Sequence, residues 1–189
     1  MKESLFYKVI RPIITGFTRF FLRPKYYGLE YINKEGRIIL GGTHTNILDC
    51  LVLISSTKRC IHFLAKDELF HGIKKIIFAN LGLIPVNRKI KDKEALDMAI
   101  KYLEDDKVIG IFPEGTTEKG RGLLPFKIGA VKMASVTGSK IVPFVIKGKY
   151  KLFSKDLRIV FGKLIMVESN DLDSENERFR NEIIRMLSI

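Results

Sequence analysis

Short apolar runs alternate with longer segments of helical periodicity over most of the chain. The runs predict strands at residues 37–42, 59–66, 83–86, 107–113, 140–148 and 156–165. Apolar residues at helical spacing predict helices at residues 46–57, 67–81, 92–106 and 127–138. Strands separated by helices of this length predict an α/β fold, with a mixed, largely parallel sheet flanked by helices.

Two local signals refine this picture. Pro143 lies within a predicted strand, and because proline has no N–H to donate, it predicts an edge strand or a β-bulge. Ser174 and Glu177 have the spacing of a capping box, which predicts that a C-terminal helix begins there. The chain shows no internal repeat and no linker, so we expect one globular domain at residues 25–189.

The N-terminal segment, residues 1–24, is apolar and aromatic but is interrupted by cations such as Lys8, Arg11 and Arg19. A spanning helix needs about 20 nearly uncharged residues, and this segment does not supply them. It also has no small-residue cleavage site of a signal peptide. We expect an amphipathic helix at an anionic membrane interface. The alternative is a helix that covers the core of its own domain.

The net charge points to a negatively charged partner. Lys and Arg number 33 against 21 Asp and Glu, which gives +12 and makes nucleic acid, anionic lipid or phosphorylated metabolites the candidates. We expect no nucleic acid, because the charge is spread along the chain without an aromatic and basic recognition motif. Cys50 and Cys60 stand in apolar surroundings, form no disulfide framework and fit a reducing compartment.

Side chains that can bind a ligand or transfer a proton follow the first four predicted strands: His44, Lys66, Arg88 and Glu114. Ligands of open α/β sheets bind beyond the carboxyl ends of the strands. If these strands run parallel, a base, two cations and a carboxylate converge at one edge of the sheet. Each cation taken alone has the alternative of being an ordinary solvated surface residue.

His44 and Asp49 stand in the stretch GGTHTNILDC. Residues five apart point about 140° away from each other on a helix, so His44 must precede the helix if the two are to meet. With Asn46 as the N-cap, Asp49 would be the third helical residue, ionised near the positive end of the helix dipole, and able to orient the imidazole. The alternative is a helix cap without chemistry.

The loop FPEGTTEKGRG follows a buried strand and brings Glu114, Gly115 and Thr116 together. Glycine allows close approach of a ligand, and the carboxylate can accept hydrogen bonds from hydroxyl groups. The loop lacks the Gly-Lys-Ser/Thr of a Walker A motif, and the alternative is a simple turn after Pro113. No pair among the histidines and cysteines has the short spacing of a zinc site, so we predict no metal.

Four ordered segments, HTNILD, AKDELF, GLIPVNR and FPEGT, resemble blocks of the lysophosphatidic acid acyltransferase (1-acyl-sn-glycerol-3-phosphate acyltransferase) family. LLPFKIGA and IVPFVI resemble the segments that follow, so the likeness extends from about residue 25 to 165. It implies a glycerol-3-phosphate acyltransferase-like fold and an enzyme of phospholipid biosynthesis. Such an enzyme transfers an acyl group from acyl-CoA or acyl carrier protein to a lysophospholipid, 1-acyl-glycerol-3-phosphate, and gives phosphatidic acid.

The resemblance also implies roles for the site residues. By this resemblance, His44 is the general base and Asp49 orients it. Arg88, with Lys66, binds the phosphate of the acceptor. The glycerol backbone is positioned by Glu114, Gly115 and Thr116. No cofactor beyond the acyl thioester co-substrate is implied, and the protein is expected at the cytoplasmic face of the cell membrane, peripheral or monotopic.

Two positions depart from the family pattern: Thr117 replaces the usual Arg, for which Lys119 or Arg121 can substitute, and Thr43 stands where Asn or Ser is frequent. Both departures bear on the acceptor, so another lysolipid, glycerol phosphate or an ornithine lipid stays open as an alternative. A third interpretation is a non-catalytic protein that binds anionic membranes or nucleic acid through its charge.

Overall fold

A computed structural model describes residues 4–33, 35–87, 93–117 and 122–189. Its central layer is a seven-stranded sheet of order β1-β7-β6-β2-β5-β3-β4. The strands are β1 (Lys25–Tyr27), β2 (Ile38–Gly42), β3 (Ile61–Lys66), β4 (Ile84–Val86), β5 (Val108–Ile111), β6 (Lys140–Lys147) and β7 (Arg158–Phe161). All neighbouring pairs are parallel except β6 and β7. The predicted α/β fold with a mixed, largely parallel sheet is confirmed.

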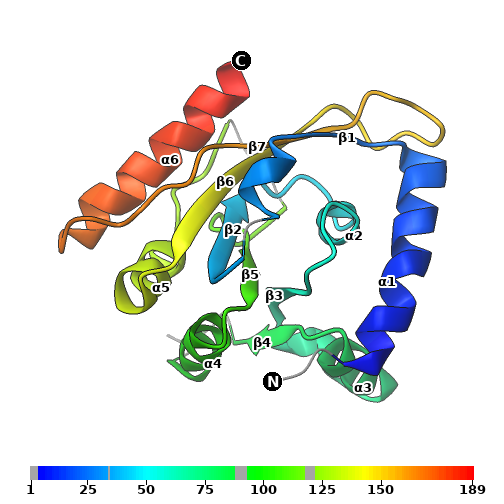
Figure 1. Ribbon diagram of the computed structural model, residues 1–189, viewed down its shortest axis with the longest axis horizontal. Helices are drawn as coiled ribbons and strands as arrows, with labels where there is room; N and C mark the ends of the chain where they lie inside the picture. Colours follow the sequence, from blue (N-terminus) through cyan, green and yellow to red (C-terminus); the bar gives the residue numbers. More distant parts are fainter. Residues whose placement is uncertain (1–3, 34, 88–92, 118–121) are drawn as a thin grey trace.

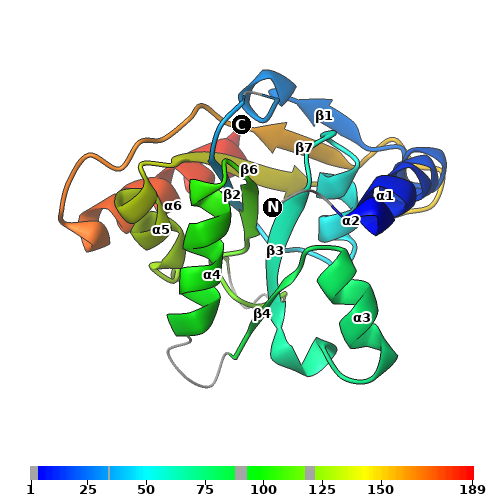
Figure 2. The ribbon, with the colours of Figure 1, turned by 60° about the horizontal axis from the view of Figure 1, so that its bottom comes forward.

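Helices cover both faces of the sheet (Figure 1). One side carries α1 (Leu5–Phe17) and α2 (Asp49–Ile54), and the other carries α4 (Lys93–Glu104), α5 (Gly129–Thr137) and α6 (Leu172–Ser188). Figure 2 places α3 (Ile73–Asn80) near β4, at one end of the sheet. Short helical turns complete the elements: η1 (Thr18–Leu22), η2 (Leu29–Tyr31) and η3 (Asp67–Leu69).

The central strand β2 explains why the sheet is covered on both sides. Successive side chains of a strand face opposite ways, so Ile38 and Leu40 pack into the core beneath α1 and α2, whereas Ile39 packs into the core beneath α4, α5 and α6. β2 ends at Gly42, where a Cβ would lie 2.0 Å from the carbonyl oxygen of Phe144 on β6. Glycine therefore permits the close approach of the two strands directly before His44.

The strand that contains Pro143 is not at an edge, because β6 lies between β7 and β2. The bulge that the proline also suggested is present. Phe144 pairs with Phe161, but Ile141 pairs with Ile165, so three steps along β6 face four steps of the opposite chain. The carbonyl of Pro143 accepts a hydrogen bond from the backbone N–H of Gly162 at 2.8 Å within this irregular stretch.

Several helix boundaries differ from the predictions. The C-terminal helix α6 begins at Leu172, because the side chain of Asp171 caps it by accepting from the backbone N–H of Ser174; the predicted Ser174–Glu177 box is wrong. The helix predicted at residues 67–81 is divided into η3, which ends at Leu69, and α3, whose N-cap is Gly72 with a φ of +57°. Strand β1 was not predicted, since only three residues pair with β7.

The predicted N-terminal amphipathic helix is confirmed as α1, and it has two apolar faces. Tyr7 is buried against the domain, and η1 buries Thr18 and Leu22. The opposite face leaves a row of apolar side chains exposed, at Leu5, Val9, Ile13, Phe17 and Phe20. The helix thus covers its own core and still presents an apolar row outward. Within the described part of the chain, no helix is both long and apolar enough to cross a membrane.

Candidate active site

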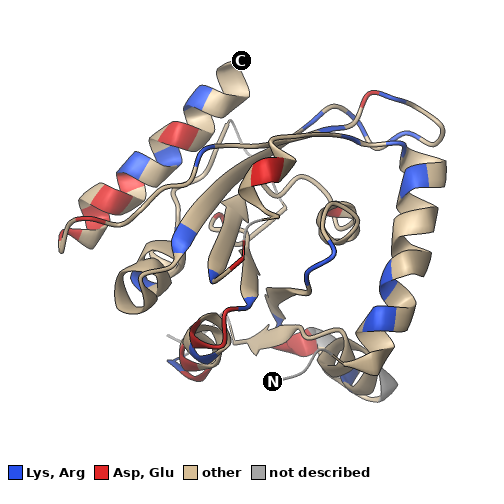
Figure 3. Cartoon of the chain, in the orientation of Figure 1, with Lys and Arg blue, Asp and Glu red and all other residues tan. Residues whose placement is uncertain are grey.

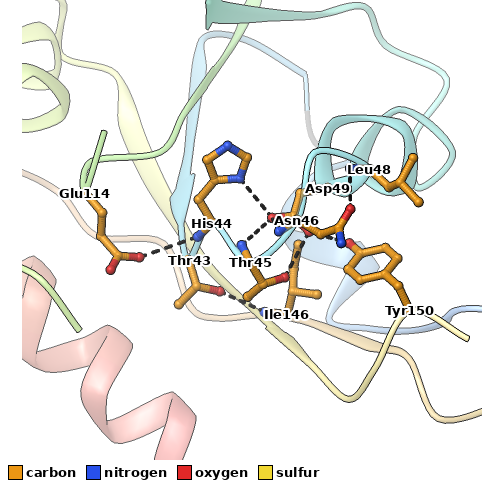
Figure 4. A network of polar contacts seen from close by, with 9 residues as sticks. All are labelled: Thr43, His44, Thr45, Asn46, Leu48, Asp49, Glu114, Ile146 and Tyr150. Atoms are coloured by element: carbon orange, nitrogen blue, oxygen red, sulfur yellow. Dashed lines mark hydrogen bonds and ion pairs between the residues drawn. The ribbon is translucent and has the colours of Figure 1, made fainter. Parts of the chain in front are cut away.

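His44 lies in the loop between β2 and α2, before the helix, as its spacing from Asp49 required. Its Nδ1 atom is 2.9 Å from the Oδ2 atom of Asp49 (Figure 4). The helix begins at Asp49 and not at the predicted position after Asn46. The Asn46 side chain instead accepts a hydrogen bond from the backbone N–H of Leu48 at 3.0 Å. This tight turn before α2 brings the imidazole and the carboxylate together.

The carboxylate of Asp49 is fully buried and accepts hydrogen bonds on both oxygens. Oδ2 also accepts from the backbone N–H groups of Thr45 at 2.5 Å and Asn46 at 2.9 Å. Oδ1 accepts from the hydroxyl groups of Thr45, at 3.0 Å, and Tyr150. Burial alone would raise the pKa of Asp49, but these hydrogen bonds and the one from His44 outweigh it and lower the pKa. Asp49 is therefore ionised at neutral pH.

The charge of Asp49 determines the tautomer of His44. An ionised carboxylate only accepts hydrogen bonds, so Nδ1 of His44 carries the hydrogen and Nε2 holds a lone pair. Nε2 points away from Asp49 in Figure 4. The imidazole also stacks on the ring of Phe112, with centroids 3.9 Å and planes 13° apart. The ring is thus fixed at one nitrogen and along one face, and the other nitrogen can take a proton.

Tyr150 belongs to this network but was not among the predicted site residues. It stands 101 residues from Asp49, in the segment that follows β6. Because β6 is the parallel neighbour of β2, both chain segments leave the sheet at the same edge. Burial and the nearby Asp49 carboxylate raise the pKa of the Tyr150 hydroxyl, which stays protonated as a donor. No local sequence signal predicts this contact; it follows only from the strand order.

Glu114 joins two loops at the same edge. Gly41 of β2 is level with Ile111 of β5, so His44 and Glu114 meet three residues further along the two parallel strands. Oε1 of Glu114 accepts from the backbone N–H of His44 at 3.5 Å, and Oε2 accepts from the backbone N–H of Leu124 at 3.1 Å. The buried carboxylate therefore connects the loop that carries His44 to the segment that carries Leu124. The substrate contact predicted for Glu114 would be a further role.

The turn suggested as the alternative reading after Pro113 is present. The backbone N–H of Gly115 donates to the carbonyl of Phe112 at 2.9 Å, and Gly115 has a φ of +72°, which favours glycine. A Cβ built on Gly115 would lie 3.1 Å from Nζ of Lys127, so an ammonium group stands beside this turn. Thr116 follows, half-buried. The turn and the predicted ligand-binding loop are thus the same segment.

The predicted cations are placed less completely. Lys66 ends β3 and is exposed at the edge that carries His44 and Glu114, since β3 runs parallel to β5. Arg88 lies outside the described residues, as do Lys119 and Arg121, the expected substitutes for the missing family arginine. The structure therefore brings three of the four strand-end positions to one edge.

Cys50 lies next to Asp49 but is not a ready nucleophile. Burial, with the negative charge of Asp49, raises the pKa of the Cys50 thiol to about 12. The reactive form of cysteine is the thiolate, so this thiol is inert at neutral pH. Among the residues that the structure describes, no three His, Cys, Asp or Glu side chains gather as a set of metal ligands.

These features define an α/β protein with a histidine oriented by a carboxylate, and a neighbouring turn, at the carboxyl edge of its sheet. The chain belongs to the Acyltransferase family, whose model matches residues 23–147. The resemblance drawn from the ordered sequence blocks is confirmed.

Named relatives and a solved structure support this assignment. The chain is 33% identical over 179 residues to the 1-acyl-sn-glycerol-3-phosphate acyltransferase of Borreliella burgdorferi, covering 91% of this chain and 65% of the relative. It is 28% identical over 150 residues to the protein of the same name from Bacillus subtilis, covering 74% and 72%. It therefore spans about two thirds of the length of these relatives.

The fold is similar to that of the 1-acyl-sn-glycerophosphate (LPA) acyltransferase PlsC from Thermotoga maritima. The crystal structure of that protein matches with a TM-score of 0.76, at 20% identity, and the match covers 96% of this chain and 80% of that one. At this level of identity the likeness concerns the fold, and the chemistry must be argued from the site.

Proposed function

We propose that the protein is a 1-acylglycerol-3-phosphate O-acyltransferase, which transfers an acyl group from acyl-CoA or acyl carrier protein and forms phosphatidic acid. The observation that carries the proposal is the hydrogen bond of 2.9 Å from His44 Nδ1 to the buried Asp49, which leaves Nε2 as a base. The family membership and the names of the relatives support the acyl group and the acceptor.

In the proposed reaction, His44 is the only side chain that takes up and releases a proton. Nε2 removes the proton of the acceptor hydroxyl while the oxygen attacks the thioester carbonyl carbon. The new C–O bond and the broken C–S bond give an ester and a thiolate, and the imidazolium returns the proton to the sulfur. Asp49 stabilises the imidazolium in between, because its charge lies against Nδ1. Tyr150 acts as a positioning residue for that carboxylate.

Direct transfer is favoured over a covalent acyl-enzyme. The thiol beside the proposed catalytic pair, Cys50, is half-buried, and its pKa of about 12 keeps it protonated. The lone pair of His44 Nε2 is available to an incoming hydroxyl, and one base can serve both halves of the proton transfer.

The acceptor phosphate needs positive charge near the base. Lys66, at the end of β3, and Lys127, beside Gly115, supply it in the described residues, and Arg88 is proposed as a third cation from the family pattern. Gly115 and Thr116 would contact the glycerol backbone.

We place the reaction at the cytoplasmic membrane surface, with the protein peripheral or monotopic. A lipid acceptor resides in a bilayer, and α1 presents an apolar row outward in a segment that also carries the cations of Figure 3. Residues 1–24 would thus form the membrane-interface helix, and residues 25–189 the acyltransferase domain.

The test is thiol release from acyl-CoA in the presence of 1-acyl-glycerol-3-phosphate. His44→Ala should lower turnover at least about 10³-fold, because it removes the base. His71→Ala, at an exposed histidine, is the matched control and should keep wild-type turnover. Thiol release that persists in folded His44→Ala would refute the assignment.

The acceptor is tested separately with a panel of lysolipids, glycerol phosphate and ornithine lipid. The highest kcat/KM should belong to 1-acyl-glycerol-3-phosphate. A higher value for a phosphate-free acceptor would contradict the proposed roles of Lys66 and Lys127.

A further inference from the structure

The loop of residues 149–156, which connects β6 to β7, packs against the N-terminal segment. It lies beside the end of α1 in both Figures 1 and 2. The backbone N–H of Phe153 donates to the carbonyl of Phe21 at 2.6 Å. The ring of Phe153 packs against those of Phe20 and Phe21, with centroids 5.8 Å and 5.6 Å apart. The loop and η1 therefore form one continuous surface.

The tip of this loop is apolar and exposed. Leu152 is 60% exposed and Phe153 51%. Phe153 also has a φ of +58°, a conformation that bulky residues rarely adopt and that costs energy. Burial in the core does not account for holding a phenylalanine in this position, since half of it remains in solvent. The exposed row of α1 continues to this tip through Phe20.

The apolar tip is surrounded by cations. The loop carries Lys149, Lys151 and Lys155 against the single acid Asp156, and Figure 3 shows blue segments along it. The guanidinium of Arg23 lies 5.6 Å from the centroid of the Phe153 ring. The cores of protein interfaces are depleted of charged residues, whereas apolar side chains flanked by lysine and arginine suit an anionic bilayer interface. The charge therefore favours a lipid surface over a protein.

We infer that the loop of residues 149–156 is a second membrane-docking element, which inserts Leu152 and Phe153 among the headgroups of an anionic bilayer beside α1 and η1. The inference rests on the proposed function. It limits the distance between the membrane and the site, because Tyr150, whose hydroxyl donates to Asp49, lies three residues before Phe153, and three residues of chain span at most about 10 Å. Docking would hold His44 close to acceptors in the bilayer.

The chain contains no tryptophan, so single tryptophans introduced into the full-length protein report their own surroundings. Leu152→Trp probes the loop, Ile13→Trp probes α1, and Val136→Trp is the control on α5, because Val136 is also 60% exposed. Vesicles of phosphatidylglycerol and phosphatidylcholine should shift the emission of the first two to shorter wavelength and leave the third unchanged. Thermal unfolding of each variant checks the fold.

A second variant tests the charge. Lys151→Glu with Lys155→Glu should weaken vesicle binding at least about tenfold, whereas Lys132→Glu with Lys140→Glu, an equal charge change away from the loop, should weaken it less. Equal losses in both pairs, or a shift of the tryptophan at 136, would mean non-specific adsorption and overturn the inference. An emission shift in Ile13→Trp without one in Leu152→Trp would also overturn the inference. Either failure leaves acyl transfer intact, since thiol release is measured separately.

Discussion

His44 and His62 hold their imidazole rings in similar ways, but we propose that only His44 takes part in the reaction. Both donate at Nδ1: His44 to the Asp49 carboxylate at 2.9 Å, and His62 to the carbonyl oxygen of Gly82 at 2.8 Å. A carbonyl can orient a ring, but a carboxylate also stabilises the imidazolium that forms when the ring takes a proton. The two histidines therefore differ in the hydrogen-bond acceptor at Nδ1 and not in the orientation of the ring.

Stacking does not distinguish the two histidines either. The ring of His44 lies 3.9 Å from Phe112, and that of His62 lies 4.2 Å from Tyr102, nearly parallel in both cases. Their positions in the sheet differ. His62 is within β3, whereas His44 is beyond the end of β2. Only the edge of the sheet leaves a ring nitrogen within reach of a substrate.

The largest expected effect comes from making the partner of His44 neutral. Asp49→Asn replaces the carboxylate with an amide and gives His44 a partner like that of His62. Turnover should fall about 10³-fold, because the tautomer and the imidazolium are no longer stabilised. Steady-state thiol release measures the change. Asp171→Asn, at the N-cap of α6, where Asn caps equally well, is the control and should keep full turnover.

A neutral partner that supported wild-type turnover would mean that orientation alone suffices. In that case the comparison would fail, and His62 would differ from His44 only by its position in the sheet.

The next prediction concerns His62 and the stability of the fold. His62→Ala removes a buried stacked ring and its hydrogen bond to Gly82, so the free energy of unfolding should fall by about 2 kcal/mol. Turnover of the folded variant should stay within about threefold of wild type, because His44 and Asp49 lie beyond the end of β2 and not on β3. Urea unfolding and thiol release give the two values. His44→Ala should show the opposite pattern, and a loss of turnover in stable His62→Ala would assign both rings to the reaction.

The contact with Gly82 favours a structural role for His62. A Cβ on Gly82 would lie 2.6 Å from Nδ1 of His62, and Gly82 has a φ of +76°. The backbone therefore packs directly on the ring, which leaves no room for a ligand at that nitrogen.

The local parts of the site were predictable from the sequence, because they depend on spacing within one segment or on strand ends. The five-residue separation of His44 and Asp49 required a loop before the helix, and parallel strands required His44 and Glu114 to meet. The start of α2 was misplaced, because Asn46 and Asp49 hydrogen-bond within the loop and delay the helix.

Contacts between distant segments were not predictable from periodicity. Tyr150 reaches Asp49 only because β6 pairs with β2, and the sequence does not reveal that order. The same order places Pro143 in the interior of the sheet, where a bulge accommodates a residue that lacks an N–H. Both are properties of the strand order, which local patterns leave open.

Tyr150 gives the smallest effect and the finest test of how the Asp49 charge is held. Tyr150→Phe removes one donor and should lower the free energy of unfolding by about 1.5 kcal/mol at neutral pH. Because the folded-state pKa of Asp49 lies below its ordinary value of 3.8, the ionised form contributes stability above that value, and the contribution is lost as the pH falls through the folded-state pKa. Removing the donor moves the folded-state pKa upward and reduces this contribution.

The stability difference between wild type and Tyr150→Phe should therefore be largest above about pH 4 and should narrow at lower pH. Chemical unfolding at a series of pH values measures it. Tyr27→Phe, at an exposed tyrosine, should show little difference at any pH. A Tyr150→Phe difference that stayed constant through this range would mean that the hydroxyl supports packing and not the charge of Asp49. In that case the hydrogen bond from Tyr150 would not help to hold the charge of Asp49. The difference between His44 and His62 would then rest on the Asp49 carboxylate alone.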